Sequence, residues 1–317
     1  MRLVYLVMKP RRKVPSRFAS ALGAGVLRAG AVAAALGLSG CSMPLPDNTN
    51  DSRGVFPYHD RDNCGFTVKY DLAPIRAVTL TPGATDLLDA LGLSKSIVAA
   101  NLGPDFAKIR ATNADFVYSG TMAGITGHVP AQDPIAGGAP LRDGLRAYDH
   151  PTHISVLSCP GHPQTLDTVY LEVATIGDIF GVPKAAAKLI YDWQKTFEQL
   201  GKRLRGLPKP NVAIVDARGQ TPKLAGPASI PQALLSYAGG ANVATGEGQW
   251  IDSDWASIKE MQPDVLLLVK GSTPPADATL AQKVEGMGGL DDGLFEAGPK
   301  VPELAQFLAK TFHPDKF

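Results

Sequence analysis

Cys41 is the residue whose sequence neighbours most clearly predict a chemical modification. It closes the run Leu38-Ser-Gly-Cys41, which is typical of the site where a bacterial lipoprotein signal is cleaved and the cysteine thiol then receives lipid. Basic side chains and a short apolar run, 29–37, precede it, and that run is too brief to span a bilayer. We therefore expect residues 1–40 to be an export signal and Cys41 to be an acyl anchor. An ordinary secretory signal with a coincidental cysteine is the alternative.

The formal net charge of the chain is different once the residues of the export signal are left out of the count. Residues 1–40 hold seven of the 31 Lys and Arg residues and none of the 30 Asp and Glu residues. The remaining chain therefore carries 24 basic and 30 acidic side chains, a formal charge of −6. An acidic exported domain argues against nucleic acid as a partner, and it leaves the lipid as the only expected contact with the membrane.

Cys64 and Cys159 remain as a pair in a compartment that favours disulfides. Both are flanked by turn-forming residues, which makes a bridge geometrically easy, so we predict a Cys64–Cys159 disulfide. Two unpaired thiols are the alternative. In the chain-entropy model, closing a loop of this length stabilises the fold by roughly 4–5 kcal/mol.

The histidines are the other candidates for chemistry, since His150, His153 and His162 lie close together in the sequence. The segment His150-Pro-Thr-His153 leads into an expected strand, so the side chains need not converge, and we expect no metal site. The sequence also contains no Gly-x-Ser-x-Gly, P-loop or His-Glu-x-x-His motif. We expect neither catalysis nor a cofactor.

The elements that must position these residues follow an α/β pattern. Short apolar runs rich in β-branched and aromatic residues predict buried parallel strands at 77–81, 96–101, 115–119 and 152–157. Residues 121–149 show no clear period and are expected to be a surface loop. Helical periodicity predicts helices at 166–179 and 183–206, and a second α/β pattern follows, with strands at 212–216 and 265–269 and helices at 230–237 and 254–261.

The fold class expected from this order is α/β, with two Rossmann-like lobes joined by one long α-helix. The expected divisions are a signal at 1–40, a flexible tether at 41–62, an N-terminal lobe at 63–182, a connecting helix at 183–206 and a C-terminal lobe at 207–317.

Several motifs, in order, resemble one known family. They are Thr81-Pro-Gly-Ala-Thr-Asp-Leu-Leu-Asp-Ala-Leu-Gly-Leu93, Asp167-Thr-Val-Tyr170, Ala238-Gly-Gly-Ala-Asn-Val-Ala244, Trp255-Ala-Ser-Ile258 and Gln262-Pro-Asp-Val265. Together they are similar to the helical-backbone class (class III) of ABC-importer substrate-binding proteins, over roughly residues 62–270. The resemblance implies a lipid-anchored, extracytoplasmic, monomeric receptor that captures a ferric siderophore, haem or cobalamin for permease subunits.

Ligand is then expected between the lobes, beyond the carboxyl ends of the strands. This selects Thr81, Thr85, Ser119, Met122, Arg218 and Lys223 as candidate contacts, although a turn after a strand is also ordinary α/β construction. Trp250 lies in the turn-rich segment 246–253, where members of the family often place an aromatic side chain against ligand. An indole that anchors its own loop is the alternative for Trp250.

Two departures from the family pattern concern transport. Family members dock on the permease through an exposed carboxylate on each lobe, but Ala107 and Ala256 occupy those positions, so Asp105 and Asp254 are the candidate substitutes. The usual final strand is not evident either. The alternative function is therefore a cell-envelope interaction or assembly lipoprotein on a binding-protein scaffold that has lost transport.

Overall fold

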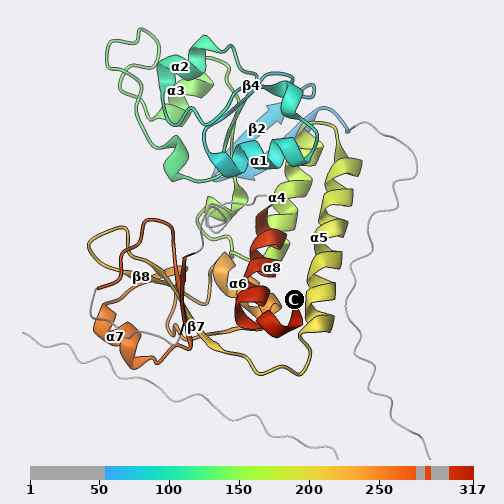
Figure 1. The fold of residues 1–317 in the computed structure, drawn as a ribbon. Coiled ribbons are helices and arrows are strands. Elements are labelled where there is room, and N and C mark those ends of the chain that lie inside the picture. The colour runs from blue at the N-terminus through green and yellow to red at the C-terminus, as the bar shows by residue number, and fades with distance from the viewer. Residues whose placement is uncertain (1–53, 276–282, 287–299) are drawn as a thin grey trace, which may run out of the picture. The chain divides into compact units, whose positions relative to one another are not determined.

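The computed structural model describes residues 54–275, 283–286 and 300–317 (Figure 1). Residues 1–40 and Cys41 lie outside these ranges, so the export signal and the lipid anchor remain predictions. None of the helices in the described ranges combines the length and the apolar character that crossing a membrane requires.

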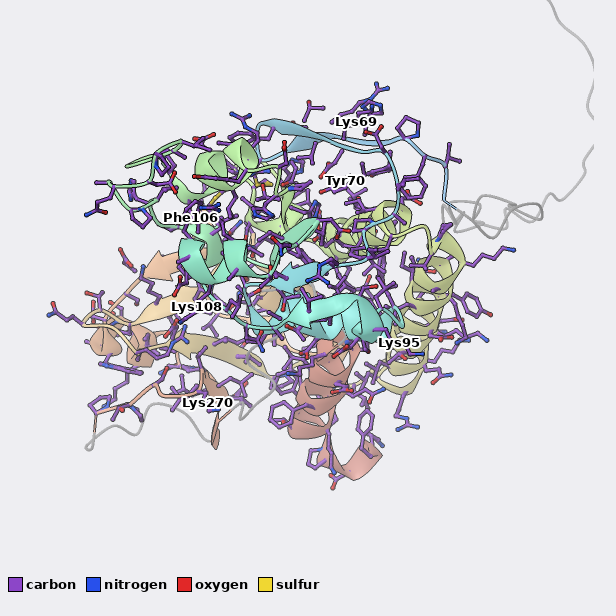
Figure 2. The ribbon with its side chains drawn as sticks, turned by 90° about the horizontal axis from the view of Figure 1, so that it is seen from above. Lys69, Tyr70, Lys95, Phe106, Lys108 and Lys270 are labelled. Carbon is purple, nitrogen blue, oxygen red and sulfur yellow. A yellow bond between two sulfur atoms is a disulfide. The ribbon has the colours of Figure 1, made fainter. Side chains whose placement is uncertain are left out.

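The described chain begins with a two-stranded antiparallel hairpin, β1 (Tyr58–Asn63) and β2 (Phe66–Tyr70). Cys64 and Gly65 form its turn, with φ of 51° and 84°. Successive side chains alternate, so Lys69 and Tyr70 point to opposite sides of β2 (Figure 2). The tether expected at 41–62 is therefore too long, because its last residues form β1. Their polar composition obscured a period-two pattern in which alternate polar side chains turn inward.

The N-terminal lobe contains a four-stranded parallel sheet in the order β4-β3-β5-β6. The strands are β3 (Ala77–Thr79), β4 (Ile97–Ala99), β5 (Phe116–Ser119) and β6 (Thr152–Ile154). Short helices connect them: α1 (Pro82–Ala90), α2 (Phe106–Ala111), α3 (Leu141–Ala147) and 3-10 turns at Ser94–Ser96, Ala123–Ile125 and Val156–Ser158.

Helix α3 corrects the expectation of a loop throughout 121–149. Leu141 and Leu145 are buried one turn apart on it. Gly144 lies so close to the Val129 side chain that an added Cβ would collide with it. The helix has only seven residues, too few for its periodicity to stand out among the surrounding Gly and Pro residues.

Two long helices follow, α4 (Leu166–Ile179) and α5 (Pro183–Arg203). Pro183 stands in the first turn of α5, where its missing N–H costs nothing. Gly177 of α4 faces Ala186 of α5 closely enough that an added Cβ would come 2.5 Å from the Ala186 Cβ, so the two helices pack tightly. Helix α5 also contacts α6 and α8, and its buried side chains join a core shared by both sheets.

The second sheet has the order β10-β8-β7-β11-β12, with β9 beside β7. Its strands are β7 (Asn211–Asp216), β8 (Lys223–Ala225), β9 (Ala241–Asn242), β10 (Trp250–Asp252), β11 (Val265–Leu268) and β12 (Lys283–Gly286). The remaining elements are α6 (Ile230–Ala238), α7 (Trp255–Glu260), α8 (Lys300–Phe312) and a 3-10 turn at Pro314–Lys316. Strand β12 pairs in parallel with β11, so a further strand is present although none was evident from the sequence.

Candidate functional site

The loops after β3 and β5 meet at the carboxyl end of the first sheet. Thr81 Oγ1 accepts a hydrogen bond of 2.9 Å from the backbone N–H of Gly120. Ser119 Oγ donates to the Thr121 carbonyl at 2.6 Å, and both hydroxyl-bearing residues are buried. Gly124 packs on them so closely that any side chain there would collide with both. The structure thus brings Thr81 and Ser119 together. The Thr81–Gly120 bond holds the two loops to each other, whereas the Ser119 bond stays within the loop after β5.

The Thr85 hydroxyl on α1 also makes its hydrogen bonds within the protein. Its hydroxyl lies 2.5 Å from that of Thr79 and 3.0 Å from Asn101 Oδ1, which connects the loops after β3 and β4. Met122 differs from these residues, because it is 37% exposed on the turn before Ala123–Ile125. Of the four candidates in this lobe, Met122 is the most exposed, Thr85 is partly buried, and ligand contact stays a prediction for all four.

Arg218 and Lys223 each face a carboxylate in the second lobe. The Arg218 guanidinium donates to both oxygens of Asp216, at 2.8 and 2.6 Å, and this hydrogen bonding lowers the pKa of the Asp216 carboxyl. Lys223 Nζ lies 3.5 Å from Asp252 Oδ1. An anionic ligand would have to compete with these carboxylates for either cation.

Trp250 is the first residue of β10 rather than part of a turn. It pairs with Ala225 of β8, and its half-buried side chain packs against the shared core cluster. The glycines at 246 and 248, with φ of 122° and 114°, supply the turn just before it. The β-forming character of Trp and Ile in this segment outweighed the turn residues that precede them.

Asp105 and Asp254 occupy equivalent positions in the two lobes, as the N-caps of α2 and α7. Asp105 Oδ1 accepts from the N–H of Lys108 at 3.0 Å, and Asp254 Oδ1 accepts from the N–H of Ser257 at 2.9 Å. These backbone hydrogen bonds lower the pKa of both carboxyls. Each Asp is followed by an aromatic residue and an alanine, so the two lobes present the same local motif.

The predicted disulfide is present. Cys64 in the hairpin turn is bonded to Cys159, directly after the 3-10 turn that follows β6, and the two Cα atoms lie 4.9 Å apart. It joins positions 95 residues apart in the sequence. The bond fastens the hairpin to the parallel sheet.

A buried ionic cluster near this disulfide was not predicted from the sequence. His153 of β6 places Nδ1 2.9 Å from Asp60 Oδ2 and Nε2 3.1 Å from Glu172 Oε1. Burial by itself lowers the pKa of His153, but the two carboxylates outweigh it and raise that pKa to about 9. Burial conversely raises the pKa of Glu172, and the positive imidazole together with hydrogen bonds lowers it below its usual range. The imidazole is therefore protonated at neutral pH.

The cluster is completed by hydrogen bonds that satisfy its remaining polar atoms. Tyr118 donates its hydroxyl proton to Glu172 Oε1 at 2.6 Å, and the N–H of Val156 donates to Oε2 at 2.9 Å. Asn63 Nδ2 donates to the Ile154 carbonyl and Asn63 Oδ1 accepts from the Ile154 N–H, each at 2.8 Å. One signal was available in the sequence, since Glu172 interrupts the apolar face of α4.

No group of three or more His, Cys, Asp or Glu side chains that could hold a metal ion occurs in residues 54–275, 283–286 and 300–317. His150 is buried, and its Nδ1 lies 2.7 Å from the Ala114 carbonyl oxygen.

Comparisons with known proteins agree with this geometry. Residues 149–286 match the periplasmic binding protein family. The chain is 21% identical over 313 residues to the uncharacterized ABC transporter substrate-binding lipoprotein YvrC of Bacillus subtilis strain 168, covering 90% of this chain and 95% of that protein.

Two solved structures have the same fold. One is an ABC-type Fe3+-hydroxamate transport system from Saccharomonospora viridis, with a TM-score of 0.63, 21% identity, and coverage of 81% of this chain and 99% of the other. The second is the periplasmic heme-binding protein RhuT from Roseiflexus, with a TM-score of 0.60, 19% identity, and coverage of 76% and 99%. The expected two-lobe α/β fold with a connecting helix is thereby confirmed.

Proposed function

We propose that this chain, whose residues 149–286 match the periplasmic binding protein family, captures a bulky small molecule outside the cytoplasm and presents it to an ABC importer. Ferric siderophores, haem and cobalamin are the candidate ligands. The names of YvrC and of the two structural neighbours support an importer role and an iron-containing ligand. The matched proteins are binding proteins, in agreement with the expectation that this chain is not an enzyme.

The observation that carries the proposal is the pairing of two α/β lobes with one 21-residue helix between them. Helix α5 buries Trp193, Phe197 and Leu200 in a core that also includes strands of both sheets. A stiff helix that is packed in this way permits little domain motion, which suits a rigid ligand held between preformed surfaces.

We further propose that Cys41 carries the lipid that holds this receptor at the membrane. The run that ends at Cys41 and the lipoprotein named among the relatives support the anchor. Intact-mass measurement of the protein extracted from membranes tests it, because Cys41→Ala should leave an unacylated protein that is released into the medium.

A tryptophan-fluorescence titration with a ferric hydroxamate, haem and cobalamin tests ligand capture. We expect saturable quenching with one of the three. Trp255→Phe is the matched control for Trp250→Phe, since Trp255 packs in a separate cluster of the second lobe. Quenching that persists in the control and falls in Trp250→Phe would place the ligand near β10. Absence of saturable binding for all three ligands would remove this function.

A second function is favoured by the fact that Asp105 and Asp254 are already used as helix caps. Both carboxylates cap helices, and alanines stand at 107 and 256, so the chain lacks the family's docking acids at their expected positions. A cell-envelope assembly role that uses the same scaffold would not need them. Cross-linking in intact membranes distinguishes the two functions, because recovery of permease subunits supports import and recovery of a cell-wall enzyme supports assembly.

A further inference from the structure

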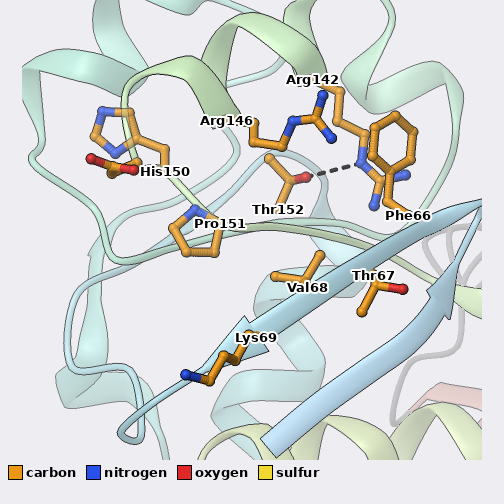
Figure 3. Close-up of a pocket in the computed structure, with 10 residues that line it drawn as sticks. Phe66, Thr67, Val68, Lys69, Arg142, Arg146, His150, Pro151 and Thr152 are labelled. Atoms are coloured by element: carbon orange, nitrogen blue, oxygen red, sulfur yellow. Dashed lines mark hydrogen bonds between the residues drawn. The ribbon is translucent and has the colours of Figure 1, made fainter.

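A cavity of about 220 Å³ opens between the hairpin and the segment that leads into β6 (Figure 3). Phe66, Val68 and Lys69 of β2 form one wall, and Pro151 and two arginines of α3 form the other. Strand β6 starts at Thr152 and runs parallel to β5, so the cavity lies at the amino end of the sheet. The proposed cargo loops follow the carboxyl ends, and the cavity is therefore a separate site.

The volume restricts what the cavity can hold. An apolar cavity of about 150 Å³ accommodates benzene, whereas sites for larger ligands occupy roughly 300–1,000 Å³. Haem, cobalamin and ferric siderophores are too large for it. A ring or a branched chain with one small polar group fits, and the lining is mainly apolar.

The positive charge in the cavity is concentrated on one face of α3. Arg142 and Arg146 are four residues apart, and their guanidinium carbons lie 4.2 and 5.2 Å from the centroid of the Phe66 ring. Like charges at this spacing repel each other. Lys69 adds a third cation, and Asp149 is the carboxylate among the residues that line the cavity. Two of the cations have ion pairs outside the lining, since Lys69 Nζ lies 2.6 Å from Asp71 Oδ1 and Arg146 Nη2 lies 3.3 Å from Asp143 Oδ1. A bound anion would offset the repulsion that remains between the two arginines, and it would share Arg146 with the exposed Asp143 carboxylate.

The bonding of Arg142 is a second observation that points to an anion site. It is 8% exposed, and its hydrogen bonds go to neutral acceptors: Nε donates to Thr152 Oγ1 at 2.9 Å and Nη2 to Asn63 Oδ1 at 2.7 Å. Within the described ranges no carboxylate forms an ion pair with Arg142, and its Nη1 has no hydrogen-bond partner. Asp60 and Asp143 attract this charge only from beyond ion-pair distance. The guanidinium therefore keeps a donor that suits an anion arriving as a ligand.

We propose that the cavity binds a small free monocarboxylic acid with a compact apolar group, aromatic or branched. The carboxylate accepts hydrogen bonds from Nη1 of Arg142 and from the Arg146 guanidinium. The apolar group lies against Phe66, Val68 and Pro151. Because Asn63 and Phe66 belong to the hairpin and Arg142 to α3, the ligand would join the hairpin to the rest of the lobe.

Calorimetric titration of the purified, disulfide-bonded protein with benzoate tests this assignment. We expect saturable binding at one site, and Arg146→Gln should weaken it by about tenfold or more, since a charge-assisted hydrogen bond is lost. Arg146 is exposed, so this variant should fold. Arg110→Gln is the matched control: Arg110 also lies over an aromatic ring, at 3.6 Å from the Tyr148 centroid, but does not line this cavity.

Three results would overturn the assignment. They are unchanged benzoate affinity in Arg146→Gln, equal affinity for the neutral isostere benzamide, and inorganic phosphate that binds as tightly as benzoate and displaces it. The test is independent of cargo binding, because saturating benzoate should leave the fluorescence titration with iron complexes unchanged. Direct competition between benzoate and an iron complex would contradict the placement at a separate site.

Discussion

Nε2 of His153 lies 3.1 Å from Oε1 of Glu172, and both side chains are almost completely withdrawn from water. Together with Asp60 they form a charged cluster under the hairpin. Removing one partner of such a cluster leaves an uncompensated buried charge, which typically costs about 3–5 kcal/mol. The cluster is therefore expected to fix the hairpin in one position, in addition to the disulfide.

The first prediction concerns the pH dependence of stability. The folded-state pKa of His153, about 9, lies above its ordinary value of 6.5. Its contribution to stability, roughly 3 kcal/mol by linkage, should be fully present below pH 6.5 and be lost as the pH rises through 9. The Glu172 pKa is lowered, so its contribution should be lost at acid pH. Urea unfolding between pH 5 and pH 10 measures the loss.

The Glu172→Gln variant tests whether deprotonation of His153 causes the alkaline loss of stability. Without that carboxylate, deprotonation of His153 should move to lower pH, and the alkaline loss of stability should move with it. Asp178→Asn is a control on the same helix, since burial alone raises the pKa of that carboxyl. An alkaline transition that stays in place in Glu172→Gln would show that another group governs it.

The disulfide gives the second prediction. Replacing Cys64 and Cys159 together by serine should lower the free energy of unfolding by roughly 4–5 kcal/mol, the value that the chain-entropy model gives for a loop of this length. Because Asn63 and Asp60 still bond to β6, the hairpin should remain attached in the variant. Denaturant unfolding measures the loss, and peptide mapping without reductant should link Cys64 to Cys159 in the parent. Free thiols at both positions in exported protein would contradict the bond.

The third prediction separates two roles of Asp105 and Asp254. Asparagine caps a helix about as well as aspartate, whereas alanine loses about 1 kcal/mol. Asp105→Asn should therefore leave the free energy of unfolding unchanged, and Asp105→Ala should lower it. The same results are expected for the two substitutions at position 254. If the charges dock on a permease, the asparagine variants should lose cross-linking to it while their melting temperatures stay unchanged. Retained cross-linking in the asparagine variants would assign both residues to capping alone.

Regular elements with strong patterns could be predicted from the sequence. The helix expected at 183–206 is found at Pro183–Arg203, because its apolar stripe and Pro183 are local signals. The Cys64–Cys159 pair could be predicted from the number of cysteines that remain after Cys41 and from the oxidising compartment. The caps at Asp105 and Asp254 could also have been recognised, since an Asp before a helical segment is a start signal.

The elements missed from the sequence depend on contacts between distant residues. Asp60, His153 and Glu172 come from β1, β6 and α4. The position of Glu172 on the apolar face of α4 indicates a buried acid, but nothing local identifies its partners. The same holds for Arg142 and Phe66, which are brought together by the hairpin. The polar residues at 58–62 therefore resembled a tether, although their partners make them part of an ordered strand.

The last prediction concerns Trp250, whose half-buried ring both packs on the core cluster and belongs to an edge strand of the second sheet. If the exposed part of the indole contacts ligand, Trp250→Ala should weaken ligand binding by about 1–3 kcal/mol. The packed part should also cost stability, but less than the roughly 3–5 kcal/mol of a fully buried large-to-small change. Ligand affinity and melting temperature are measured on this variant and on Trp193→Ala, where the ring is 5% exposed. We expect Trp193→Ala to lower the melting temperature more and the affinity of the folded protein less. Unchanged affinity in Trp250→Ala beside a large fall in melting temperature would assign Trp250 to the scaffold.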